Sequence, residues 1–455
     1  MSQEKLSALR AAMAKHGISH YLVVGSDAHQ NEYVPECWQR RVWLSNFTGS
    51  AGDVLVGLED AVLMTDGRYS IQAKNQLDLA HFDYLISQKG VLDSIQIWLD
   101  KAQSPVVLGL DPMLISQNFY LALQKIAKDK NISLKLIDEN LVDTIWADRP
   151  KEPQQPVLTI EEKYTGLSVA QKLTMLREKM SKDQIEHYFI SALDSIAWLL
   201  NIRGTDVEYN PLTISYLLVQ AEDVVWYIDE AKVSKEQQKA LSEYGIRIAP
   251  YNAFLRQDQA LTGSMALDPK STSCGVFAHF KKQGATIMAK GCHIVDFKAC
   301  KNPTELTWMR KQHLEDGAIM VRFLYWLEHQ SSASERSECQ VQAYLDQLRL
   351  SHKDNRGLSF PSISGFGPNG AVVHYRASAE TNLAITEDNL YLIDSGGQYL
   401  GACTDITRVV HLGEPTCEHK KFYTLVLKGH LALRHSIFPH GISGAHLDVL
   451  ARTPL

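Results

Sequence analysis

The chain has 455 residues and a mass of 51.1 kDa, which favours about three domains at roughly 150 residues per domain. Hydrophobic residues make up 45% and charged residues 22% of it. These proportions are ordinary for a globular protein and exclude a disordered, collagen-like or coiled-coil chain. The net charge of −6 argues against a nucleic-acid partner, which would need a strongly basic face.

Seven cysteines are scattered without a CxxC pair, so we expect neither a disulfide framework nor a zinc ribbon, and a reducing compartment. The N-terminal stretch shows amphipathic spacing at Leu6, Leu9, Ala12 and Met13 rather than the apolar core of a signal peptide. No run approaches about 18 apolar residues. We therefore expect a cytoplasmic location and no membrane partner.

Residues 1–150 alternate helical and strand patterns, which predicts a first α/β domain. Helices are expected over 6–16 and 70–79, and strands over 20–24, 53–57, 61–64 and 106–110. Three prolines then lie among polar residues over 149–156. Because proline disfavours helix before itself, this stretch predicts an extended linker and a domain boundary.

A second α/β domain is predicted over 157–301. Helices are expected over 168–180 and 183–193, and strands over 217–219 and 224–228. A new helix is expected to start at Asn302, because Asn302 can cap, Pro303 suits the first helical position and Glu305 can reach back to the cap. The apolar spacing after it predicts a helix of roughly seven turns and a third domain over 302–455.

Two acidic residues in the third domain invite a metal site. The strand-like runs 391–393 and 406–412 flank a glycine-bearing segment, which predicts a hairpin. A turn centred on Tyr399 and Leu400 would put Asp394 directly opposite Asp405, with Cβ atoms about 4.5–5.5 Å apart. A bridging divalent cation would remove the repulsion, and oxygen ligands favour Mn²⁺ or Mg²⁺. The alternative is a plain turn with Asp405 as a solvated edge residue.

His374 is the second candidate. We expect it at the end of a short strand over 371–373 that follows a loop rich in glycine and proline. A histidine there could polarise a carbonyl or hold an oxyanion. The alternative is a structural histidine, as most of the 17 histidines are expected to be.

The run 360–416 resembles the catalytic domain of the metal-dependent Xaa-Pro aminopeptidases (aminopeptidase P) of the creatinase/methionine aminopeptidase, or pita-bread, superfamily. The likeness is to the long three-domain cytosolic type and covers nearly the whole chain. The other matching segments are DAHQNEY (27–33), GSAG (49–52), TDGRY (65–69), DSIAWLLNIRG (194–204) and EYNP (208–211). The resemblance implies an α/β (α+β) fold: two creatinase-like N-terminal α/β domains and a pita-bread catalytic domain.

The resemblance also implies roles for individual residues. Asp394 and Asp405 would be two of five ligands of a dinuclear manganese site, His374 would contact the substrate carbonyl, and Arg68 would touch the peptide. The alternative for Arg68 is a local ion pair with Asp66. The family mechanism uses a metal-bridging hydroxide, which attacks the bond before a penultimate proline. The substrate is thus a peptide with proline in second position, and family members are often homodimers.

The chain departs from the family pattern near its end. The resemblance implies a further metal-binding His, a second substrate His and two Glu downstream of a stretch like 440–450, whereas the sequence stops at Leu455. We therefore expect a truncated pita-bread domain that lacks three of five ligands, binds metal weakly and has little or no peptidase activity. Cys403 also stands where the family usually has a small or polar residue.

Two rival functions remain open. One is a non-catalytic pita-bread module that binds proteins without metal, although such members lose the ligand carboxylates. The other is a metal-free creatinase-like hydrolase, a group that lacks the long first domain and the paired aspartates.

Overall fold

The computed structural model describes residues 2–102, 105–256, 260–329 and 331–455. It divides into two compact units. Unit 1 holds the chain up to Glu315 together with Lys353–Phe360 and Gly397–Thr404, and unit 2 holds Asp316–His352, Pro361–Gly396 and Asp405–Leu455. Each is described by itself.

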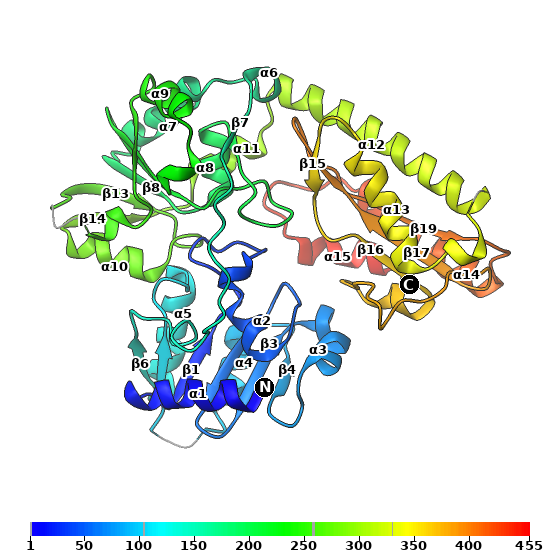
Figure 1. Cartoon of the computed structure of the whole chain (residues 1–455), viewed down its shortest axis with the longest axis horizontal. Helices are drawn as coiled ribbons and strands as arrows, with labels where there is room; N and C mark the ends of the chain where they lie inside the picture. The colour runs from blue at the N-terminus through cyan, green and yellow to red at the C-terminus, as the bar shows by residue number, and fades with distance from the viewer. Residues whose placement is uncertain (1, 103–104, 257–259, 330) are drawn as a thin grey trace. The chain divides into compact units, whose positions relative to one another are not determined.

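The first sheet of unit 1 has the strand order β4-β3-β2-β1-β5-β6 (Figure 1). Its strands are β1 (His20–Val23), β2 (Asp53–Gly57), β3 (Ala61–Thr65), β4 (Asp83–Ile86), β5 (Val107–Leu110) and β6 (Ser133–Leu136). The accompanying helices are α1 (Ser2–Lys15), η1 (Glu36–Trp38), α2 (Arg40–Ser45), η2 (Gly67–Tyr69), α3 (Ser70–Gln76), α4 (Val91–Leu99) and α5 (Gln117–Asp129). β1 pairs antiparallel with β2 and parallel with β5. All four β1 residues are buried, as expected for a strand covered on both faces.

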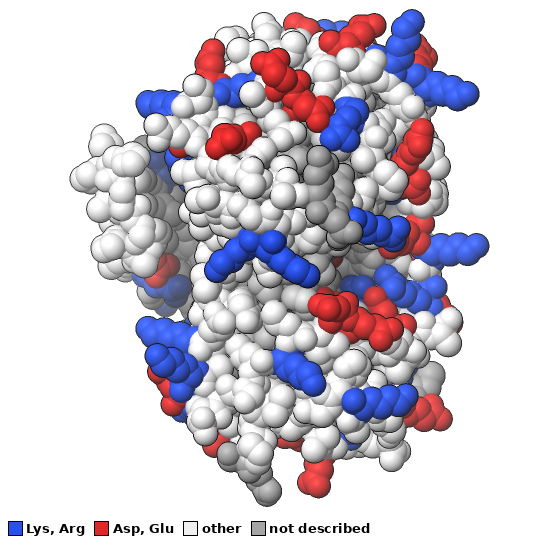
Figure 2. Space-filling view, turned by 90° about the vertical axis from the view of Figure 1, so that its left-hand side faces the viewer, with Lys and Arg blue, Asp and Glu red and all other residues white. Residues whose placement is uncertain are grey.

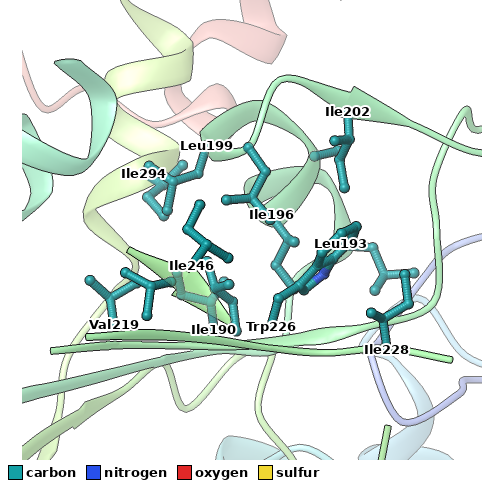
Figure 3. Packing of buried hydrophobic residues seen from close by; sticks show 14 of the residues in the cluster. Ile190, Leu193, Ile196, Leu199, Ile202, Val219, Trp226, Ile228, Ile246 and Ile294 are labelled. Atoms are coloured by element: carbon teal, nitrogen blue, oxygen red, sulfur yellow. The ribbon is translucent and has the colours of Figure 1, made fainter. Parts of the chain in front are cut away.

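The second sheet of unit 1 has the order β12-β11-β10-β8-β13-β14. Its strands are β8 (His187–Ile190), β10 (Tyr216–Gln220), β11 (Val224–Tyr227), β12 (Ile246–Ala249), β13 (Gly263–Leu267) and β14 (Ala285–Ala289). Its helices are α6 (Glu162–Thr165), α7 (Val169–Lys182), α8 (Leu193–Leu199), η3 (Glu230–Lys232), α9 (Lys235–Ser242), η4 (Ala253–Arg256), α10 (Cys274–Lys282) and α11 (His293–Ala299). Figure 3 shows Leu193 and Ile196 of α8 pointing toward Trp226 on the sheet, and all three are buried.

The helix expected over 183–193 is wrong. α7 ends at Lys182, and Gln184 adopts a left-handed conformation with φ of 57°. The four residues of β8 are all buried between β10 and β13. Aromatic and β-branched side chains suit such a central strand, so tertiary burial decided the outcome here.

The remaining elements lie outside the two six-stranded sheets. Helix α12 (Pro303–His329) has the expected length, and its reciprocal cap is confirmed, since Asn302 N donates to Glu305 Oε2 (2.9 Å) and Glu305 N to Asn302 Oδ1 (3.0 Å). Further elements are β7 (Leu158–Thr159), β9 (Ile202–Arg203), η5 (Ala333–Glu335), α13 (Glu338–Leu350), β15 (Asn355–Leu358), β16 (Ile363–Phe366), η6 (Gly367–Ala371), β17 (Leu390–Ser395), β18 (Gly397–Tyr399), β19 (Ile406–His411), α14 (Cys417–Arg434) and α15 (Gly444–Arg452). Unit 1 contains the pairs β7–β9 and β15–β18, and unit 2 the antiparallel sheet β16-β17-β19.

Surface and composition features complete the description. On the face in Figure 2, Lys and Arg are interspersed with Asp and Glu. All seven cysteines are free thiols. Large exposed apolar side chains gather on α14, α15 and the segment between them, including Phe422, Val426 and Ile437. In the described part of the chain, no helix combines the length and the apolar character needed to cross a bilayer.

Candidate active site

Strands β17 and β19 carry the two aspartates of the predicted metal site. Along β17, Tyr391, Ile393 and Ser395 are buried, whereas Leu392 and Asp394 point to the other face. This period of two is the ordinary alternation of a strand with one face on the core. Asp405 directly precedes β19 and is exposed. The packing of Tyr391 and Ile393 thus turns Asp394 away from the core.

The predicted register is wrong: the turn lies one residue further along the chain, so the partner of Asp394 shifts by two residues. Asp394 lies opposite Thr407, not opposite Asp405. The tight turn is centred on Leu400 and Gly401, because Tyr399 N donates to the carbonyl of Ala402 (2.8 Å). A Cβ on Gly401 would lie 2.7 Å from Cβ of Trp308, so this position demands glycine, and glycine favours tight turns.

The two carboxylates are nevertheless close. Asp405 lies two residues before Thr407, so it is the diagonal neighbour of Asp394 on the same face. Burial, the charge of Asp394 and a hydrogen bond with it raise the pKa of Asp405. Thr407 Oγ1 donates to Asp394 Oδ1 (2.8 Å), which holds that carboxylate in place. The two carboxylates are therefore diagonal neighbours rather than direct partners, and a hard divalent cation held by the pair stays a prediction.

His374 does not end a strand. The segment Gly367–Ala371 forms the 3₁₀ helix η6, and a turn follows in which Tyr375 N donates to the carbonyl of Val372 (3.1 Å). The expected strand over 371–373 is wrong because glycine, proline and asparagine in η6 favour tight turns. A Cβ on Gly370 would lie 3.7 Å from Cβ of Leu392, so η6 lies over the sheet face that carries Leu392 and Asp394. Half-buried His374 follows it.

A buried glutamate holds this turn, and no sequence pattern marks it. Glu338, the first residue of α13, is fully buried. Its carboxylate accepts hydrogen bonds from Phe366 N (2.6 Å), Tyr375 Oη (2.7 Å) and Leu383 N (3.0 Å). Asn369 Nδ2 donates to both carboxylate oxygens (3.1 Å each). In sequence, Glu338 looks like an ordinary acidic residue in the first turn of a helix.

Arg68 belongs to unit 1, in η2. Its Nε and Nη2 donate to the two carboxylate oxygens of Asp66 (2.9 and 2.7 Å), and its own N–H also donates to Asp66 Oδ1. The alternative of a local ion pair is thus what the structure shows. The Arg68 side chain keeps 41% of its surface exposed, so a peptide contact stays a prediction.

Models of three families match the chain in order. The first creatinase/prolidase N-terminal domain model covers residues 5–142, the second covers 148–305, and the metallopeptidase family M24 model covers 307–455. The M24 match implies a metal cofactor. The exact domain limits 1–150, 157–301 and 302–455 stay a prediction.

Two curated relatives are named probable Xaa-Pro aminopeptidase P. The Neurospora crassa protein is 39% identical over 99% of this chain and 68% of its own length, and the Sordaria macrospora protein is 38% identical over 99% and 75%. The crystal structure of the X-prolyl aminopeptidase from Caenorhabditis elegans, described as a cytosolic enzyme with a di-nuclear active site, aligns with a TM-score of 0.92 and 31% identity over all of this chain and 77% of that one. The fold is therefore creatinase-like in its N-terminal domains and pita-bread in the M24 part, and the chain belongs to the Xaa-Pro aminopeptidase P family of peptidases.

Proposed function

We propose that Asp394 and Asp405 are ligands of a dinuclear manganese centre in an aminopeptidase that removes the N-terminal residue before a penultimate proline. The observation that carries this is the pair itself: two carboxylates share one sheet face, and burial together with the charge of Asp394 raises the pKa of Asp405. Outside a functional site, such a pair only destabilises the sheet. Divalent cations there would lower the pKa of a bound water and polarise the peptide carbonyl.

The proposal gives this chain's own residues distinct tasks. Thr407 orients Asp394 through its hydroxyl. His374, which follows η6 on the Asp394 side of the sheet, donates to the oxygen of the scissile carbonyl and stabilises the charge that develops there. Glu338 positions the turn that carries His374. Arg68, paired with Asp66 but exposed, offers its guanidinium to the peptide.

Asp394 and Asp405 are two of the five ligands that the family resemblance implies. We therefore expect these two carboxylates by themselves to hold manganese weakly. Weak binding follows because two carboxylates supply few of the ligands that a divalent cation needs.

Calorimetric titration with Mn²⁺ tests the metal site. The proposal expects weak binding to the parent chain that disappears in Asp394→Asn and in Asp405→Asn. The matched control is Asp388→Asn, an exposed aspartate in the same unit, which should bind as the parent does. Equal binding by all four chains would refute the assignment, and two tight sites in the parent would refute the expected weakness.

A peptide assay tests the activity separately. Peptides with proline in second position are compared with the same peptides carrying alanine there, with and without Mn²⁺. Any hydrolysis should need Mn²⁺ and penultimate proline and should vanish in Asp405→Asn. Hydrolysis that survives removal of divalent ions, or that ignores proline, would contradict the proposal.

The second candidate is a non-catalytic module that binds proteins. The close Asp394–Asp405 pair disfavours it, because a surface that only binds protein gains nothing from two repelling carboxylates. We also propose a cytoplasmic location, supported by the seven free thiols, and a homodimer, which sedimentation analysis can test.

A further inference from the structure

A cavity of about 290 Å³ lies within unit 1, and its lining includes neither Asp394 nor Asp405. The small strand pairs β7–β9 and β15–β18 and the segments next to them supply its wall. Apolar side chains line it, among them Leu158, Ile160 and Leu400. Its size is close to the lower end of the range of about 300–1,000 Å³ that small-molecule sites occupy.

Two arginines are among the residues that line this cavity, Arg203 on β9 and Arg356 on β15. Arg203 Nη1 donates to the carbonyl of Ile202 (2.8 Å), and Arg356 Nη1 to those of Asn355 (2.6 Å) and Lys353 (3.1 Å). Among the residues that the structure describes, neither arginine forms an ion pair. Most of the N–H groups on both side chains therefore remain available to a ligand.

The carboxylates nearest to the cavity are already engaged. Glu161, which lines the cavity, accepts a hydrogen bond from Lys163 Nζ at each of its carboxylate oxygens (2.7 and 2.8 Å). Glu305, a carboxylate whose charge raises the pKa of Arg203, accepts hydrogen bonds from Trp198 Nε1 (3.1 Å) and from the backbone N–H of the α12 cap. Burial lowers the pKa of Arg203, and the neighbouring Cys403 and Glu305 offset this only in part.

We propose that this cavity binds an organic carboxylate with a small apolar body, the chemistry of a peptide's C-terminal residue or of a free carboxylic acid. The two guanidiniums would grip the carboxylate, because their planar forks match its geometry. The apolar body would replace water against Leu158, Ile160 and Leu400. The site is independent of the metal pair and of the peptidase activity.

Calorimetric titration of the 455-residue chain with N-acetyl-leucine tests the site. N-acetyl-leucinamide has the same body without the charge and should bind about tenfold more weakly or worse. Acetate and inorganic phosphate have the charge without the body and should also bind more weakly. If N-acetyl-leucinamide binds as tightly as N-acetyl-leucine, the site does not recognise a carboxylate. If phosphate binds as tightly, the site does not need the apolar body. If N-acetyl-leucine does not bind at all, the proposed site is refuted.

Variants locate the binding. Arg203→Gln and Arg356→Gln should each weaken binding of N-acetyl-leucine about tenfold. Arg247→Gln is the matched control, since Arg247 is exposed on β12 and does not line the cavity. Arg356 is also exposed, so its variant keeps the test decisive if Arg203→Gln fails to fold. Unchanged binding in Arg356→Gln would overturn the proposal.

Chemical labelling gives a second readout, and peptide length separates the two ligand sources. N-acetyl-leucine should protect Arg203 and Arg356, but not Arg247, from phenylglyoxal. Acetyl-Ala-Ala-Leu should protect them equally if peptide C-termini are the ligand and poorly if only free acids fit. If neither carboxylate ligand reduces the phenylglyoxal labelling of Arg203 and Arg356, the proposed site is refuted.

Discussion

At the scale of single residues, the Asp394–Asp405 pair makes a prediction about charge. The pKa of Asp405 is raised above its ordinary value of 3.8, so the folded chain favours the protonated form. Stability is therefore lost as pH rises through 3.8 to the raised value, and the loss persists at neutral pH. Asp394→Asn should lower the pKa of Asp405 and stabilise the metal-free chain at pH 7 by about 0.5 kcal/mol.

Carboxyl NMR titration and urea unfolding measure the two effects. Asparagine keeps an acceptor for Thr407, so the variant removes charge and little else. Asp448→Asn is the control, because Asp448 lies on α15 in an exposed pair with Arg452. If the pKa of Asp405 stays where it is in Asp394→Asn, repulsion between the two carboxylates is not its cause.

Glu338 makes the second prediction at this scale. Alanine at this position would leave two backbone N–H groups and the Tyr375 hydroxyl without their buried acceptor. We expect a loss of about 3 kcal/mol in the free energy of unfolding and faster amide exchange at Phe366 and Leu383. Glu387→Ala, on a side chain that is 73% exposed, should change the free energy of unfolding by less than about 0.5 kcal/mol. Equal effects of the two substitutions would contradict the positioning role.

At the scale of elements, the hairpin turn sets the register of the strands that carry the aspartates. Gly401→Ala would bring Cβ to 2.7 Å from Cβ of Trp308, close to the backbone where no rotamer change can relieve it. We expect a loss of about 1–3 kcal/mol of stability and weaker Mn²⁺ binding. Gly444→Ala, with nothing within 4 Å of the added methyl, is the control for unfolding and calorimetry. Unchanged stability in Gly401→Ala would show that the turn tolerates the shift.

Elements with a strong local signal could be predicted from the sequence. The α12 cap and four of the six first-sheet strands, β1, β2, β3 and β5, could be predicted because capping residues and apolar runs act locally. The edge strands β4 and β6, which are exposed or half-buried, could not. The strand at His187–Ile190 was missed because its partners in β10 and β13 lie far away in the chain. The register at Asp394 could not be predicted for a similar reason. Trp308, nearly a hundred residues away in sequence, restricts position 401 to glycine and so decides which two residues form the turn.

At the scale of the whole molecule, motif order predicted the family, whereas single contacts stayed out of reach. The segments at 27–33, 65–69 and 194–204 gave the fold class because their sequence order is specific. The ion pair of Arg68 with Asp66 could be named only as an alternative, and Glu338 could not be found at all. Neither contact leaves a periodic pattern. The Arg68–Asp66 pair is local, within one turn, whereas the contacts of Glu338 join segments that only tertiary packing brings together.

One contact of the 27–33 segment links the two large sheets of unit 1. His29 is buried, with Nδ1 2.8 Å from the carbonyl of Ser191 and Nε2 2.8 Å from Tyr251 Oη. A carbonyl can only accept, so Nδ1 carries the proton and Nε2 of the neutral ring accepts from Tyr251. Tyr216 packs against the ring at 4.5 Å between centroids, and Asp27 is the neighbouring acid.

This link makes stability depend on pH. Burial lowers the pKa of His29 from 6.5, so the unfolded chain takes up a proton that the folded chain refuses. The stabilising effect is therefore complete above pH 6.5 and is lost as pH falls below it. His29→Gln should be less stable than the parent by about 1–2 kcal/mol at pH 7.5, and the difference should shrink toward pH 5.5.

Urea unfolding followed by tryptophan fluorescence gives the free energy of unfolding of both chains as a function of pH. His20 and His279, whose pKa values burial also lowers, titrate in both chains and cancel. A difference that stays constant with pH would mean that His29 joins the sheets by packing alone.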